Sequence, residues 1–205
     1  MPRAGVNTDV VVAEAARVAD EVGFDRLTLA AVAERLGVRL PSLYNHIAGV
    51  DELRRRLAVF AVIGLGDAIT KAAVGRAGTD ALLAVADAYR LWAHTHPGLY
   101  QASLRAPEPS DADHMAASDA ALAVVKAVLA GYGLKDDDVI DATRALRSAL
   151  HGFVSLEAAG GFGLPRDVDR SFSRLVTAVD TAFADWRPPN PAGPGSVASR
   201  SPLAD

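Results

Sequence analysis

The chain has 205 residues, half of them hydrophobic, and its 21 basic and 25 acidic side chains give a formal net charge of −4. This length and apolar content allow one large or two small domains with a buried core. No apolar run approaches the roughly 18–20 residues that cross a bilayer, and Asp9 and Glu14 make the N-terminus a poor signal peptide. The lack of cysteine excludes disulfides and thiolate chemistry. These features predict a soluble, cytoplasmic protein.

The charge is unevenly distributed along the chain. Residues 1–56 hold eight Arg against eight Asp and Glu, so the whole acidic excess lies in the rest of the sequence. A domain with this balance does not indicate a broad nucleic-acid-binding surface. Any contact with DNA must therefore use a small local patch.

Apolar residues recur at helical spacing along nearly the whole chain, which predicts an all-α protein of about nine helices. Thr28 is suited to capping a helix that Gly37 ends. Asp51 is expected to cap a long helix that reaches about residue 73, and the next helix is expected from Asp80 to about residue 94. No alternating Val, Ile and Thr pattern with turn signals supports a sheet.

The last two predicted helices, 136–159 and 168–186, each carry an apolar stripe. The stripe of the final helix follows a spacing of three and four residues, which is typical of a helix buried along its length. Burying two such helices well usually takes four, which favours a dimer. The residues expected at this dimer interface are Leu146, Leu150, Phe172, Leu175, Val179 and Phe183. Residues 187–205 are rich in Pro, Gly and Ser and are expected to be disordered.

The stretch GVRLPSLYNHIAGVDELRR, residues 37–55, contains two helix breaks and a helix that is too short to be stable alone. Two helices joined by a short turn that contains glycine, with the second helix brief and exposed, form a helix-turn-helix. Leu43 and Ile47, four residues apart, are its expected inward anchors. The residues expected to face outward are Leu40, Pro41, Tyr44 and Asn45.

The run TLAAVAERLGVRLPSLYNHIAGVDELRRRL is similar to the N-terminal DNA-binding domain of TetR-family transcriptional regulators, and the match covers roughly residues 8–60. The remainder resembles the subgroup whose regulatory half is called a WHG domain. This second resemblance rests on Trp92 in LWAHTHPGLY, on His151 and Gly152 in ALHGFVSLEAAGGFG, and on the final amphipathic helix.

The resemblance implies a role for eight residues on DNA. It implies phosphate contacts from Thr28, Ser42, Tyr44, Asn45 and His46, and reading of base edges by Arg39, Leu40, Pro41 and also Tyr44. Val50 departs from the family pattern, because many members have a phosphate-binding lysine there. The basic run Arg54, Arg55 and Arg56 is a candidate substitute; the alternatives are a lower affinity for DNA and an ordinary solvated helix face.

The resemblance also implies an organisation and a mechanism. Residues 1–50 would form the helix-turn-helix domain, the helix 51–73 would link it to the core, and residues 51–186 would form a regulatory and dimerisation domain. A homodimeric repressor would leave a palindromic operator of double-stranded DNA when a small-molecule effector binds. The candidate pocket residues are Phe60, Tyr89, Trp92, Tyr100, Met115 and Phe153, although each is also an ordinary core residue type.

Two other classes of protein fit the sequence less well. An all-α enzyme would need a nucleophile beside a base or a phosphate-binding loop, and neither pattern is present. A helical adaptor without a DNA role would leave the exposed Pro-Ser-x-Tyr-x-His segment unexplained. His94 and His96 resemble half of a metal site but have no acidic or thiol partner at ligand spacing, so no metal or cofactor is expected. The sequence leaves open the effector, the operator, and whether the protein represses or activates.

Overall fold

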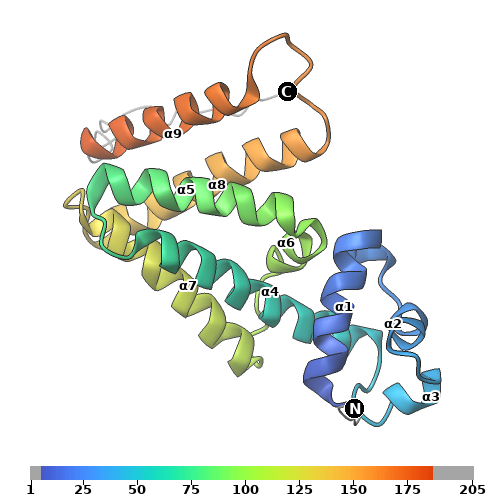
Figure 1. The fold of residues 1–205 in the computed structure, drawn as a ribbon. Helices are drawn as coiled ribbons and strands as arrows, with labels where there is room; N and C mark the ends of the chain where they lie inside the picture. Colours follow the sequence, from blue (N-terminus) through green and yellow to red (C-terminus); the bar gives the residue numbers. More distant parts are fainter. Residues whose placement is uncertain (1–5, 187–205) are drawn as a thin grey trace, which may run out of the picture.

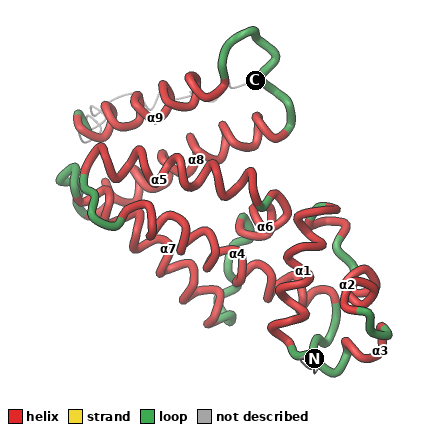
Figure 2. The backbone as a smooth tube through the Cα atoms, in the orientation of Figure 1, coloured by secondary structure: helices red, strands yellow, loops and turns green. Residues whose placement is uncertain are grey.

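The computed structural model describes residues 6–186, and within that range the chain is helical without strands (Figures 1 and 2). The elements are α1 (Thr8–Val22), the 3-10 turn η1 (Phe24–Arg26), α2 (Leu29–Leu36), α3 (Leu40–Leu43), α4 (Val50–Ala73), α5 (Gly78–Thr95), α6 (Pro97–Ser103), α7 (Ala112–Ala130), α8 (Asp136–Ala158) and α9 (Val168–Ala184). The predicted all-α fold is confirmed, with nine α-helices among residues 6–186. No helix of the described residues combines the length and apolarity that a membrane span requires. The predicted disordered tail, 187–205, lies outside the described residues.

The first three helices form a small unit at one end of the molecule, blue in Figure 1. The Asn7 side chain caps α1 by accepting a hydrogen bond from the backbone N–H of Val10, and Thr28 caps α2 in the same way. Gly37 ends α2 with a φ of 66°, a left-handed conformation that glycine adopts without the strain of a Cβ atom. The predicted capping residue and stop of α2 are therefore confirmed.

Two helices begin slightly earlier than predicted. α4 starts at Val50 with Gly49 as its N-cap, so Asp51 lies in the first turn rather than at the cap. The Glu52 carboxylate accepts a hydrogen bond from the N–H of Ala48 and satisfies a backbone donor just ahead of the helix. α5 likewise starts at Gly78, before Asp80. A carboxylate in the first turn already interacts favourably with the positive end of a helix, so an acidic residue there marks the region rather than the cap.

The buried side chains form two clusters joined along α4. The first cluster fills the space between α1, α2, α3, the first half of α4, and α6, and so crosses residue 50. The second lies between the far end of α4 and helices α5, α7, α8 and α9. Leu65 of α4 and Tyr89 of α5 pack against both clusters. Packed side chains along α4 and α5 therefore connect the two ends of the molecule.

The apolar stripes of α8 and α9 are covered within one chain. α9 packs against α5 and α8, and it buries Phe172 and Phe183 to 1% exposure. Leu146 and Leu150 of α8 are also buried. The prediction that these four side chains meet a partner chain was wrong. A stripe identifies the buried face of a helix but not the element that covers it. Leu175 and Val179 are half-buried at the edge of the second cluster.

The start of α6 is fixed to the end of α1. Asp20 Oδ1 accepts hydrogen bonds from the backbone N–H groups of Gly98 and Leu99, both at 2.9 Å, and Oδ2 lies 3.0 Å from Nδ1 of His96. A Cβ atom at Gly98 would lie 2.0 Å from the carbonyl oxygen of Ala19. Only glycine lets the two backbones approach this closely.

We expect Gly98→Ala to destabilise the protein by about 1–3 kcal/mol or more, because the added methyl overlaps the α1 backbone, which cannot move without disturbing the first cluster. Thermal or denaturant unfolding followed by circular dichroism measures the loss. Gly152→Ala in α8 is the matched control: its Cβ meets nothing within 4 Å, so it should raise stability by about 0.5–1 kcal/mol. Equal effects of the two substitutions would contradict the tight contact.

Candidate nucleic-acid interface

α3 exposes one face and anchors the other. Leu43 is fully buried and Ile47 is 1% exposed, whereas Tyr44 is 55% exposed. Pro41 occupies the first turn, where its missing N–H removes no helical hydrogen bond. Leu40 and Asn45 are also exposed. The predicted inward and outward positions are confirmed, and the short helix is held from behind by the first cluster.

Seven of the eight predicted DNA-contacting side chains are exposed. Thr28 uses its hydroxyl to cap α2, accepting from the N–H of Ala31 at 3.2 Å, yet its side chain remains at the surface. His46 is half-buried, and its carbonyl oxygen accepts a hydrogen bond from Thr8 Oγ1 at 3.3 Å. This bond ties the end of the recognition segment to the start of α1. The geometry leaves the outward groups of α3 free to contact another molecule.

Two residues of the basic run on α4 are engaged within the protein. Arg54 donates to the backbone oxygen of Asp25 at 3.0 Å and lies over the ring of Phe24, 5.9 Å from its centre. Arg56 pairs with Glu52 one turn earlier, at 2.8 Å. These contacts stabilise α4 and its junction with η1. They do not support the idea that the run replaces the lysine absent at position 50.

Arg55 makes the third contact, between α4 and α7. One of its terminal nitrogens donates to both carboxylate oxygens of Asp111, at 2.8 Å each. Asp111 is buried and also caps α7 by accepting from the N–H of His114. The Arg55 guanidinium holds the pKa of Asp111 below its usual range. This ion pair connects the helix that follows the recognition segment to the body of the molecule.

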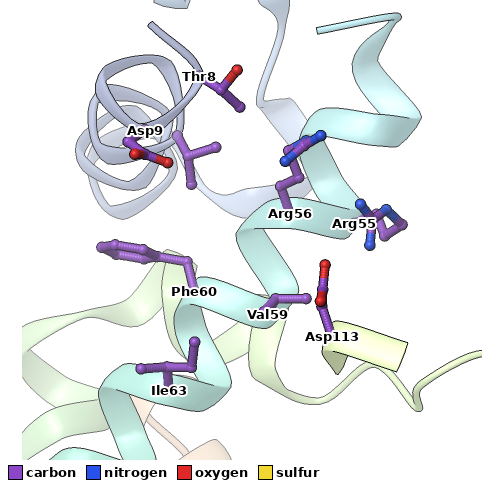
Figure 3. Close-up of a pocket in the computed structure, with 9 residues that line it drawn as sticks. Thr8, Asp9, Arg55, Arg56, Val59, Phe60, Ile63 and Asp113 are labelled. Atoms are coloured by element: carbon purple, nitrogen blue, oxygen red, sulfur yellow. The ribbon is translucent and has the colours of Figure 1, made fainter. Parts of the chain in front are cut away.

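Two of the predicted pocket residues lie on the surface instead. Phe60 is 43% exposed and Met115 is 39% exposed. Phe60 lines an open groove of about 270 Å³ between α1, α4 and α7 (Figure 3). The groove is lined by Thr8, Asp9, Val12, Arg55, Arg56, Val59, Phe60, Ile63 and Asp113. Phe60 is an ordinary core residue type, but on α4 its side chain lies at the surface and belongs to neither buried cluster.

A chain of polar groups connects α5, α6 and α8. The hydroxyls of Tyr89 and Tyr100 are 3.0 Å apart, and the Tyr100 hydroxyl lies 2.7 Å from Nδ1 of His151. Ser155 Oγ lies 3.3 Å from the same nitrogen. Burial raises the pKa of both tyrosines, so both are neutral hydroxyls. Nδ1 of His151 is thus within hydrogen-bonding distance of two hydroxyl groups.

This chain ends at an open surface cavity of about 230 Å³ that is lined by Leu104, Arg147, Ser148 and His151, of which Arg147 and Ser148 are exposed. Tyr89 and Tyr100 reach it through His151, whereas Trp92 belongs to the first cluster and Phe153 packs on Phe172 in the second. The six predicted pocket residues therefore do not gather at one site. Arg147 and Ser148 lie on the polar face of α8. The prediction of pocket residues from apolar and aromatic side chains therefore did not include them.

His94 and His96 each contact a carboxylate from a distant part of the chain. His94 Nε2 lies 2.8 Å from Glu157, and His96 meets Asp20. Local spacing could not indicate either partner, because each lies more than 60 residues away along the chain. The two histidines contact different carboxylates, Glu157 and Asp20, and so do not share an acidic ligand. Among residues 6–186, no group of three or more His, Cys, Asp or Glu could hold a metal ion.

Comparison with known proteins agrees with this architecture. Residues 11–57 match the family described as "Bacterial regulatory proteins, tetR family", and residues 82–179 match "Tetracyclin repressor-like, C-terminal domain". The chain is 40% identical over 174 residues to an uncharacterized HTH-type transcriptional regulator of Mycobacterium tuberculosis, covering 84% of this chain and 79% of that protein. The chain belongs to the TetR family of transcriptional regulators. It is a DNA-binding regulator rather than an enzyme. The narrower WHG assignment stays a prediction.

A second sequence relative and two solved structures of the same fold also match. YobS, an HTH-type regulator of Bacillus subtilis, is 37% identical over 84% of this chain and 90% of its own. A TetR variant from Acinetobacter baumannii in complex with minocycline superposes with a TM-score of 0.68 at 22% identity, over 90% of this chain and all of that one. The TetR-family regulator PfmR from Thermus thermophilus has a TM-score of 0.62 at 20% identity, over 83% of this chain and 97% of its own.

We expect Asp111→Asn to reduce the acid sensitivity of this TetR-family protein. Because the folded-state pKa of Asp111 is depressed, its stabilising contribution is present above its unfolded pKa, about 3.9, and is lost as the pH falls through the lower folded value. Melting temperatures measured from about pH 6 to about pH 2 should fall less steeply for the variant than for the wild type. Arg55→Gln should flatten the same part of the profile. Two variants that retain the full acid-induced fall would contradict the role of this pair.

Proposed function

We propose that this TetR-family regulator is a homodimeric repressor that binds a palindromic operator and leaves it when a small effector occupies the regulatory half. Residues 1–50 would form the DNA-binding unit and 51–186 the regulatory and dimerisation unit. The observation that carries the proposal is the exposed face of α3, supported from behind by buried Leu43 and Ile47. A short helix with one anchored face and one free face is suited to the major groove.

The outward side chains divide by reach and chemistry. Arg39, Leu40 and Pro41 lie at the start of α3, the part of a recognition helix that contacts base edges. Thr28, Ser42, Tyr44, Asn45 and His46 are short polar groups suited to phosphates, with Tyr44 also close enough for a base.

The proposed interface neutralises few phosphates. Residues 1–56 carry no net charge, and Arg54, Arg55 and Arg56 have partners within the chain. Each phosphate contact contributes about 0.9 to the slope of log affinity against log salt. The few contacts of each protomer, doubled in a dimer, would therefore still make DNA binding weaken as the salt concentration rises, without a broad basic surface.

α6 is the proposed link between effector and DNA. Its Tyr100 meets His151 at the cavity, and its first turn is held by Asp20 of α1. A ligand that shifts His151 or Tyr100 would therefore move α6 and, through Asp20, the DNA-binding unit. In a dimer this motion changes the separation of the two α3 helices, which must match the half-site spacing. The minocycline-bound relative supports a small-molecule effector.

The proposed dimer uses the outward faces of α8 and α9. The inward apolar stripes are already covered, but the outer face of α9 carries small exposed residues, among them Thr177, Ala178 and Thr181. Asp138 of α8 accepts a hydrogen bond from Trp186, just after the end of α9, so the two helices are held side by side. Small side chains allow helices from two chains to approach closely, and a two-fold contact of this kind matches a palindromic operator.

We expect Tyr44→Ala and His46→Ala to abolish detectable operator binding while the melting temperature stays within a few degrees of the wild type. Tyr44 is exposed and His46 is half-buried, so neither side chain lies in the buried core. Fluorescence anisotropy with DNA flanking the protein's own coding region measures binding. Leu43→Ala is the contrasting variant, since truncating this buried residue should cost about 2–5 kcal/mol of stability. Unfolding of the Tyr44 variant would instead identify this tyrosine as a packing residue.

We expect Ala178→Glu to give a folded monomer that binds operator DNA weakly. The substitution places two carboxylates in the proposed two-fold contact without disturbing a buried residue. Sedimentation equilibrium gives the mass, and circular dichroism checks the fold. Ala116→Glu, on the exposed side of α7, is the matched control and should remain dimeric. The reverse pattern would move the interface to α7.

A further inference from the structure

We propose that the effector of this regulator is a small organic carboxylate, bound by Arg147, Ser148 and His151 at the cavity between α6 and α8. The inference rests on the proposed function, because it names the ligand class of the effector that the regulator responds to. It goes further in assigning the site to polar residues of α8 rather than to an apolar pocket.

The positive charge of Arg147 has no acidic partner among the residues that line the cavity. Arg147 has no hydrogen bond or ion pair with any residue between 6 and 186, and no acidic side chain lines the cavity. Arg144, on the same helix, differs in having Asp141 at 3.6 Å. The charge of Arg147 also reaches the tyrosine chain, since it opposes the effect of burial on the pKa of Tyr100. A guanidinium that faces a cavity without an acid favours an anionic ligand.

The hydrogen-bond chain presents a second donor to the same cavity. Tyr100 is neutral, so its hydroxyl can donate to Nδ1 of His151 and accept from Tyr89. A histidine that accepts at Nδ1 carries its proton on Nε2. Nε2 of His151 has no hydrogen-bond partner among the described residues, and the ring lines the cavity. Guanidinium, imidazole N–H and the Ser148 hydroxyl form a set of donors without a charged acceptor.

The remaining wall of the cavity is the side chain of Leu104, which favours an apolar group in the rest of the ligand. Leu104 at the end of α6 is 36% exposed and supplies apolar surface beside the donors. A carboxylate can receive two parallel hydrogen bonds from one guanidinium, while an attached ring or short branched chain covers Leu104. The cavity of about 230 Å³ has room for a molecule of the size of benzoate. Occupancy would draw together α6 and α8, the two helices that the Tyr100–His151 bond already joins.

The test uses the full chain, with benzoate as the probe and neutral benzamide as its matched control, in isothermal titration calorimetry. We expect benzoate to bind at least tenfold more tightly than benzamide. Arg147→Gln should remove that preference, and Arg144→Gln, three residues away on the same helix, should keep it. Arg147 and Arg144 are both exposed, and melting temperatures verify that both variants remain folded.

Three results would overturn the proposal: no benzoate binding, equal binding of benzoate and benzamide, or an unchanged preference in Arg147→Gln. Inorganic phosphate that competes as strongly as benzoate would overturn the carboxylate part. The DNA assay is read separately. Arg147-dependent benzoate binding by a protein that ignores operator DNA would refute the repressor function but not the site. Operator binding without a benzoate preference would refute only the site.

Discussion

The contact between Asp20 and the start of α6 is the constraint on which the rest of the molecule depends. One carboxylate oxygen accepts from two backbone N–H groups at the positive end of a helix. Gly98 lets the backbones touch at a distance that no Cβ would tolerate. Gln101, one turn later, accepts from the N–H of Phe24. α6 is thus attached to the DNA-binding end by several polar contacts along its length, although it is only seven residues long.

The other end of the same short helix enters the regulatory half. Tyr100 is buried, yet its hydroxyl is paired on both sides, by Tyr89 and by His151. A buried hydroxyl without partners would cost free energy, so a change at His151 has consequences for the position of Tyr100. Because packed cores shift between discrete arrangements rather than deforming smoothly, such a helix can transmit a local change over the length of the molecule.

The regulatory end is also held by charge. Arg90 of α5 pairs with Glu157 of α8 and Asp169 of α9, and its guanidinium lies 4.8 Å from the centre of the Phe172 ring. Three helices meet at this one side chain, and His94 adds a further contact to Glu157. The partly buried network closes α9 onto its own chain. It explains why most of the apolar stripe of α9 is buried within its own chain.

The sequence by itself determined the helices, the stop at Gly37, and the inward and outward sides of α3. These features depend on spacing, capping and glycine conformation, which act over a few residues. It also supported the family through the run from residue 28 to residue 57. Only the tertiary structure decided which element covers each apolar stripe, and that Arg55 pairs with Asp111, 56 residues along the chain. It also brought Arg147 and His151 to a cavity beside Tyr100. The reason is physical: periodicity records that a face is buried, but a partner 50 or more residues away leaves no trace in the local pattern.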